Sequence, residues 1–313
     1  MTLRFTLRQL EYFVAVGDLG SIALAAERVN VSSPSISTAI AQLETEFGLP
    51  LFVRKHAQGL ALTQSGRQLL AQAQDILAQA EALNRQANTL SGQVQGPLAL
   101  GCLVTFAQMV VPRLRRRFET RYPDARIMQT ELDHLAIINQ LRDATIDIAL
   151  SYDMEIPRDL EFHPLAELKP YAMMCPEHPL AHLKSVSVEQ LAEHPMVLLD
   201  LPISSDYFLS FFTQIGLRPV IAERTRDMAV ARGLVANGFG YSIANIRPLN
   251  DLAPDGQKLR FIPLERAVQP MRMGLVMAQG AMNALTIRAF VEECRKDVAE
   301  GTMPGLNSPI VPN

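Results

Sequence analysis

The sequence predicts three successive parts: a winged helix-turn-helix that is all-α with a small β wing, a long coiled-coil linker helix, and an α/β region of two lobes. Three observations lead to this fold class. Short amphipathic helices precede a hairpin pattern in residues 1–62, an unbroken heptad pattern follows in residues 63–91, and strands alternate with helices from Pro97 onward. With 313 residues the chain is long enough for more than one hydrophobic core.

Composition excludes several classes of protein. Hydrophobic residues make up 48% of the chain and charged residues 19%, which excludes a disordered chain. The three cysteines are far apart and form no Cys-x-x-Cys motif, so we expect no disulfide scaffold, no metal site and a reducing, cytoplasmic compartment. No segment approaches the ~20 apolar residues of a membrane span, and we expect no signal peptide. The balance of 29 Lys+Arg against 32 Asp+Glu argues against a simple polybasic nucleic-acid binder.

Three short helices are expected first. Ser21 and Ser32 are suited to cap the second and third helices, because a serine hydroxyl accepts a hydrogen bond from a free amide of the first turn. Pro34 fits the first turn of the third helix, and Gly48 is expected to end it, while the first helix is expected to end near Gly17. Short strands at 51–53 and 60–62 complete the wing.

The second and third helices have helix-turn-helix spacing. Ala25 and Ala26 let the helices approach closely, so the third helix is expected to be a recognition helix for DNA. The charged side chains of the wing are expected to contact phosphate groups of DNA, which position a protein without specifying a sequence. The alternative is that they are solvated loop charges. The candidate DNA contacts are Ser32, Ser33, Pro34, Ser35, Ser37, Thr38 and Gln42 in the helix and Arg54, Lys55 and His56 in the wing.

Thr63 begins a long helix with an apolar residue at every a and d position of a heptad. The narrow seam predicts that this helix pairs two subunits, whereas the alternative is a helix that lies on its own domain. Residues 92–96 contain two glycines and are expected to be a hinge. The predicted dimerisation residues are Leu69, Ala73, Ile76, Ala80, Leu83, Ala87 and Leu90.

The region after the hinge begins with a βαβαβ pattern, which predicts a parallel sheet with right-handed crossovers. Its length favours two lobes over one. We expect the first lobe in residues 97–168 and 275–300, the second in residues 169–274, and a flexible tail in residues 301–313.

Ligands of doubly wound sheets bind beyond the carboxyl ends of the strands, where the two lobes are expected to form a cleft. Amides and hydroxyls at a helix start suit a carboxylate, so a small organic anion is the preferred ligand. For any single Ser or Thr, an ordinary N-cap is the alternative role. The candidate residues at these strand ends are Thr105, Phe106, Tyr152, Asp153, Ser204, Ser205 and Asn245.

The order of these segments resembles the LysR-type transcriptional regulators over nearly the whole chain. The resemblance rests on the blocks Leu7–Phe13, Ala25–Arg28, Val31-Ser32 with Pro34, Gln42–Glu44 and Gly48–Phe52, and on Gly101, Pro112, His178–Ala181 and Gly238–Gly240 in the C-terminal half. It implies a periplasmic-binding-protein-like effector domain, binding to double-stranded DNA as a homodimer or homotetramer, and an inducer that touches Thr105 and Ser204 or Ser205. Contact with RNA polymerase is compatible with this interpretation.

The recognition helix departs from the family pattern. The family usually has Gln where this chain has Ser33, and basic residues where it has Thr38 and Ala41, and short side chains discriminate bases less well. Residues 1–93 hold seven Lys+Arg and seven Asp+Glu. We therefore expect DNA affinity to come from placed contacts and two-fold pairing, with a shallow salt dependence.

Catalysis is not expected, because the sequence has no G-x-S-x-G, P-loop or H-E-x-x-H motif, and no cofactor is implied. The competing interpretation is a small-molecule-binding protein or α/β enzyme whose N-terminal region serves only assembly.

Overall fold

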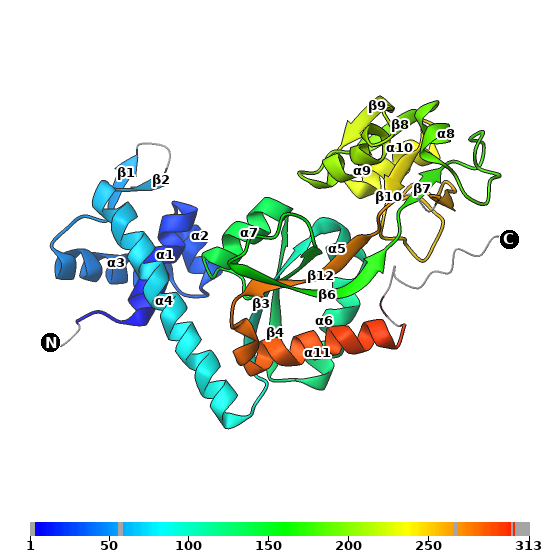
Figure 1. Cartoon of the computed structure of the whole chain (residues 1–313). Helices are drawn as coiled ribbons and strands as arrows, with labels where there is room; N and C mark the ends of the chain where they lie inside the picture. The colour runs from blue at the N-terminus through cyan, green and yellow to red at the C-terminus, as the bar shows by residue number, and fades with distance from the viewer. Residues whose placement is uncertain (1–3, 56–58, 266–267, 302, 304–313) are drawn as a thin grey trace. The chain divides into compact units, whose positions relative to one another are not determined.

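The computed structural model describes residues 4–55, 59–265, 268–301 and 303, without the side chains of residues 54–55, 84–86 and 88–91. The chain divides into two compact units, Met1–Ala87 and Asn88–Asn313. Figure 1 labels their helices and strands.

The first unit is a winged helix-turn-helix. The predicted caps are confirmed, since the Ser21 hydroxyl accepts from the Leu24 amide and the Ser32 hydroxyl accepts from the Ser35 amide. The first helix is longer than predicted: it ends at Leu19 and is capped by Gly20, which has a φ of +61°. The elements are α1 (Leu7–Leu19), α2 (Ile22–Arg28), α3 (Ser33–Phe47), β1 (Phe52–Lys55), β2 (Gly59–Leu62) and α4 (Gln64–Ser91).

One apolar core holds these helices together. Phe13 of α1 and Ile36 and Leu43 of α3 are fully buried in it, and each contributes about 1.5–3 kcal/mol of burial free energy. The wing is fixed to α3 by the Glu44 carboxylate, which accepts hydrogen bonds from the backbone amides of Leu51 at 2.7 Å and Phe52 at 3.2 Å. Helix α3 and the wing are therefore held to each other as one unit.

Lobe I of the second unit is built on a five-stranded sheet with the order β4-β3-β5-β12-β6. The sheet is mixed and not parallel throughout, because β12 runs antiparallel to both of its neighbours. Its strand β12 begins at Met271, four residues before the predicted return of the chain to lobe I at position 275. The strands are β3 (Gly96–Leu103), β4 (Ala125–Leu132), β5 (Ile148–Tyr152), β6 (Leu160–Leu168) and β12 (Met271–Ala278).

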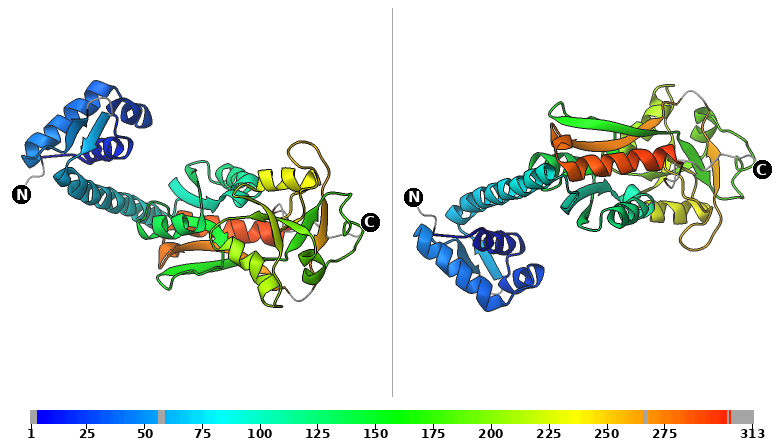
Figure 2. Two further views of the ribbon diagram at one scale, coloured as in Figure 1. Left: turned by 90° about the horizontal axis from the view of Figure 1, so that it is seen from above. Right: turned by 90° about the horizontal axis from the view of Figure 1, so that it is seen from below.

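Helices cover both faces of this sheet. Ile148 and Leu150 pack with α6 and α11, whereas Ala149 between them packs with α7, because successive residues of a strand point to opposite faces. Figure 2 shows α11 running along one side of the sheet. The helices are α5 (Val104–Met109), α6 (Val111–Arg121), α7 (His134–Arg142) and α11 (Leu285–Ala299), with a 3-10 turn at Ala281–Asn283.

Lobe II contains an antiparallel sheet with the order β10-β7-β11 and a parallel β8-β9 pair. An isolated bridge between Met196 and Tyr241 connects the two. Helices α8 and α9 pack on one face, and α10 packs on the other. The elements are β7 (Tyr171–Met174), α8 (Val188–Ala192), β8 (Pro195–Leu199), α9 (Ser204–Thr213), β9 (Val220–Thr225), α10 (Met228–Ala236), β10 (Ser242–Ala244) and β11 (Arg260–Pro263). No helix among the described residues is long and apolar enough to cross a membrane.

Candidate functional site

The candidate DNA-contacting residues lie at the start and on the outer face of α3. Ser32, Pro34, Ser35, Ser37, Thr38 and Gln42 are exposed, and Ser33 is half-buried. Several of their polar atoms are already engaged within the helix, since the Ser32 and Ser35 hydroxyls share a 2.8 Å hydrogen bond and the Ser37 hydroxyl donates to the Ser33 carbonyl.

Gln42 is held by the first helix. Its side-chain oxygen accepts a hydrogen bond from the Gln9 amide at 2.8 Å, so its remaining amide group is oriented before any ligand arrives. Two candidates in the wing, Arg54 and Lys55, lie on β1, but only their backbone is described. His56 lies outside the described residues.

The heptad residues of α4 fall into two groups. Ala73 is 3% exposed in the core of the first unit and Leu69 packs against the same core, so the prediction that Ala73 contacts a partner is wrong and its own domain covers it. Ile76 and Leu83 are 39% and 68% exposed. Among the other predicted dimerisation residues, Ala80 is half-buried and Ala87 is exposed. The side chain of Leu90 is not among those that the structure describes.

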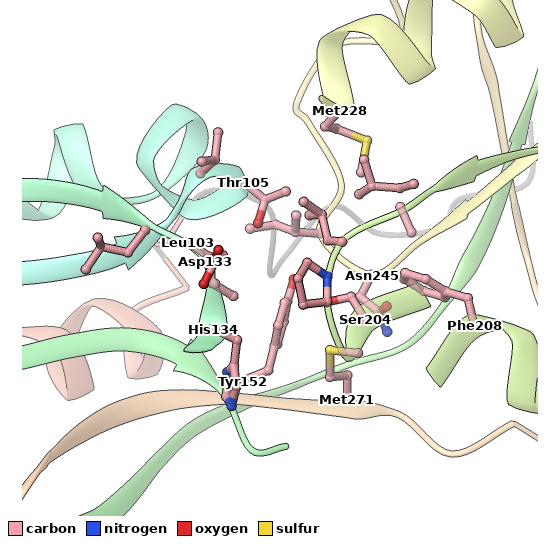
Figure 3. A pocket seen from close by; sticks show the side chains of 17 residues that line it. Leu103, Thr105, Asp133, His134, Tyr152, Ser204, Phe208, Met228, Asn245 and Met271 are labelled. Carbon is pink, nitrogen blue, oxygen red and sulfur yellow. The ribbon is translucent and has the colours of Figure 1, made fainter. Parts of the chain in front are cut away.

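A cavity of about 70 Å³ lies between lobe I and lobe II, and we call it the cleft cavity. Figure 3 shows Thr105, His134 and Tyr152 on one side of it and Ser204, Phe208 and Met228 on the other. Such a volume exceeds the roughly 10–15 Å³ needed by one water, so it admits a small molecule. Its lining residues are Leu103, Val104, Thr105, Leu132, Asp133, His134, Tyr152, Leu199, Leu201, Pro202, Ser204, Phe208, Met228, Ala244, Asn245, Ile246 and Met271.

The polar groups of the cleft cavity are neutral, with the exception of one carboxyl group. Asp133 caps α7 by accepting from the Ala136 amide at 2.8 Å, and no Lys or Arg occurs among the lining residues. Burial raises the pKa of the Tyr152 phenol, and a hydrogen bond with Thr105 acts in the opposite direction. The electrostatics therefore offer no cation to an anionic ligand, contrary to the prediction from the sequence.

Asn245 carries an unused acceptor. Its Nδ2 donates to the Leu168 carbonyl at 2.9 Å and to the Tyr207 hydroxyl at 3.3 Å, while its buried Oδ1 has no hydrogen-bond partner among the described residues. A buried polar atom without a partner is costly, so a ligand that donates a hydrogen bond here would be favoured.

His134 is buried on the lobe I side of the cavity. Its Nδ1 shares a 3.2 Å hydrogen bond with the Ser151 hydroxyl, and its Nε2 makes no well-formed hydrogen bond with any described residue. Burial lowers the pKa of His134, and the Met154 backbone acts in the opposite direction. The ring is therefore favoured in its neutral form.

The lobe II edge of the cavity contains a strained turn. Ile203 has a φ of +66° and a ψ of −44°, and the Ser204 amide donates to the Pro202 carbonyl at 2.7 Å. This is a γ-turn of the rare positive-φ kind, and a β-branched residue is strongly disfavoured there.

Four of the seven predicted ligand residues line the cavity: Thr105, Tyr152, Ser204 and Asn245. The other three do not line it. Phe106 is fully buried in the lobe I core, Asp153 forms an ion pair with Arg272, and Ser205, in the first turn of α9, is not among the lining residues. Phe106 misses the cavity because α5 begins at Val104, and one step along a helix rotates a side chain by about a quarter turn.

Two kinds of lining residue were missed by sequence reasoning. Asp133 and His134 directly follow the carboxyl end of β4. The expectation that ligands bind beyond the carboxyl ends of strands therefore finds both residues when it is applied to β4 as well. Met271 lies at the start of β12, which this expectation does not cover because β12 is antiparallel.

Comparisons with known proteins agree on both units. The family model described as LysR substrate binding domain matches residues 91–299, and the model described as bacterial regulatory helix-turn-helix protein, lysR family, matches residues 7–67. The HTH-type transcriptional regulator YnfL of Escherichia coli is 30% identical over 273 residues, covering 85% of this chain and 90% of that protein.

Solved structures resemble the whole chain. The crystal structure of HinK, a LysR family transcriptional regulator from Pseudomonas aeruginosa, matches with a TM-score of 0.63 and 30% identity over 94% of this chain and 99% of that one. Full-length CbnR in complex with its target DNA has a TM-score of 0.67 over 93% and 99% of the two chains, and at 24% identity it supports the fold alone.

Proposed function

Because this chain belongs to the LysR family of DNA-binding transcriptional regulators, we propose that a small molecule in the cleft cavity switches its action on transcription. The observation that carries this proposal is the cavity itself, which both lobes line. A ligand that binds one arrangement of the lobes more tightly than another shifts their equilibrium, and hence the geometry available to the DNA-binding domains.

The ligand that fits this cavity is small, largely apolar and uncharged. The lining residues are mostly hydrophobic, and Thr105, Ser204 and Asn245 supply hydroxyl and amide groups. A carboxylate placed here would meet Asp133 and no cation, and desolvating a charge without a partner is expensive. A neutral compound with one hydrogen-bond donor suits the unpartnered Asn245 oxygen.

Thermal-shift measurements against matched pairs of small aromatic alcohols and the corresponding carboxylates test this ligand class. We expect alcohols to raise the melting temperature more than their carboxylates, because a ligand that binds only the folded state stabilises it. Thr105→Val should remove the shift, whereas Thr213→Val, at an exposed position of α9, should retain it. A shift caused by carboxylates alone would contradict the proposal.

Footprinting of the DNA upstream of the encoding gene tests the regulatory role. We expect a protected region that Thr105→Val and Ser204→Ala leave intact while they reduce the response to the ligand. Absence of any protected region would favour the alternative, in which the N-terminal region serves only assembly.

We further propose that α4 pairs two subunits through Ile76 and Leu83. Their exposed apolar surface would be buried in such a pair, which favours association. Leu83→Glu should lower the oligomeric state in sedimentation experiments, whereas Gln74→Glu, an equal charge change at an exposed position on the opposite face of α4, should leave it unchanged. An unchanged oligomer in Leu83→Glu would contradict this role.

A further inference from the structure

A second cavity lies beside the cleft cavity, and we call it the arginine cavity. Its volume is about 360 Å³, several times that of the cleft cavity. Gln108 and Met109 at the end of α5 line it from lobe I, and Arg232 of α10 and the loop 246–250 line it from lobe II. Met228 and Ile246 line both cavities, so the two share a wall.

Two arginines give this cavity a positive charge. Arg232 and Arg247 each have a buried Nε that finds no hydrogen-bond partner in the part of the chain that the structure describes. Nη2 of Arg232 donates to the Leu252 carbonyl and to Asn250 Oδ1 at 3.4 Å, and the Arg247 guanidinium lies 4.9 Å from the centre of the Phe261 ring. These contacts fix both guanidinium groups but neutralise neither.

No ion pair between either arginine and a carboxylate occurs among the residues that the structure describes. Elsewhere in lobe II, the exposed Arg224 is paired with Asp200 at 3.2 Å. Burial lowers the pKa of Arg232, which is the effect expected when a guanidinium is partly removed from water without a carboxylate beside it. A half-buried cation of this kind is stabilised by an anion that supplies the missing charge.

We propose that the arginine cavity is a second small-molecule site, which binds a compound bearing a carboxylate or phosphate group through Arg232 and Arg247. The planar guanidinium fork matches both oxyanions in geometry and charge. This site goes beyond the proposed function, because the cleft cavity takes an uncharged ligand and the arginine cavity takes an anion. Met228 and Ile246 line both cavities, and any coupling of the two ligands through this wall must be reciprocal, because linkage requires each ligand to change the affinity of the other by the same factor.

Isothermal titration calorimetry of the full chain with succinate and with inorganic phosphate, at matched ionic strength, tests the proposal. We expect saturable binding of at least one anion. Arg247→Gln should weaken it by about tenfold or more, the value of one charge-assisted hydrogen bond. Arg218→Gln, at an exposed arginine of lobe II that lines neither cavity, should retain the affinity of the unmodified chain.

The outcomes separate the anions and the two cavities. Binding of succinate alone assigns a carboxylate ligand, and binding of phosphate alone assigns a phosphate ligand. Either result supports the site, as does binding of both anions. Absence of saturable binding, or unchanged binding in the Arg232→Gln/Arg247→Gln double variant, would overturn the proposal. Binding that is lost in Thr105→Val but kept in Arg247→Gln would place the anion in the cleft cavity and would also overturn it. Arg247→Gln carries the test by itself if Arg232→Gln fails to fold.

Discussion

The side-chain amide of Asn245 donates a hydrogen bond to the carbonyl oxygen of Leu168 across 2.9 Å. Leu168 is the last residue of β6 in lobe I, and Asn245 follows β10 in lobe II, so this hydrogen bond joins the two lobes. Because Asn245 also lines the cleft cavity, a ligand that engages its free Oδ1 acts on a residue that already connects the lobes.

Asn245→Ala should lower the free energy of unfolding of the second unit by about 1–3 kcal/mol, because it leaves the Leu168 carbonyl in a buried site without its hydrogen-bond donor. Urea denaturation followed by circular dichroism measures the change. Asn139→Ala, at an exposed position of α7, serves as the control and should stay within about 0.5 kcal/mol. Equal stability of both variants would show that the contact between Asn245 and Leu168 contributes nothing.

The strained turn at Ile203 predicts which of two substitutions at this position, glycine or alanine, gives the more stable protein. At an ordinary position alanine is more stabilising than glycine by about 0.5–1 kcal/mol. At a φ of +66° this order should reverse, because a Cβ is disfavoured there by about 1–2 kcal/mol. We therefore expect Ile203→Gly to be more stable than Ile203→Ala by about 1 kcal/mol in denaturant titrations. An alanine variant that equals or exceeds the glycine variant would show that the turn is not strained.

Burial of His134 makes stability depend on pH. Its pKa is lower in the folded chain than the value of about 6.5 in an unfolded chain, so the unfolded state binds the proton more readily. Stability should be unaffected by this group above about pH 7 and should fall as the pH drops below about 6.5. The nearby charges of Asp133 and Glu155 oppose the shift without reversing it.

The measurement for His134 is the melting temperature between about pH 7 and pH 5. His134→Gln should flatten the loss on acidification, whereas His182→Gln, at an exposed position, should leave it unchanged. Part of the slope should remain in His134→Gln, because burial also lowers the pKa of His178. Identical slopes in the unmodified chain and in His134→Gln would refute the role of His134.

Local chemistry made much of the fold predictable. Ser32 caps α3 as expected because capping depends on a hydroxyl and an amide three residues apart. The direction of β12 and the burial of Phe106 depend on contacts between distant segments, which the local pattern does not contain. Site prediction failed in the same way: Thr105 and Phe106 are neighbours in sequence, but only the start of α5 decides which of them faces the cavity.

The recognition helix offers the sharpest test of how this chain binds DNA. Thr38 is exposed on α3, where an arginine could reach a base edge or a phosphate. Thr38→Arg should therefore tighten operator binding and steepen the slope of log affinity against log salt concentration by about one unit, which is the contribution of one added phosphate contact. Gln72→Arg, at an exposed position of α4, adds the same charge away from α3 and should have a smaller effect.

Because residues 1–93 have no net charge, the slope of log affinity against log salt concentration for the unmodified chain should stay well below about ten for a single dimer. A slope near ten would mean that bulk electrostatics, rather than placed contacts, provides the affinity.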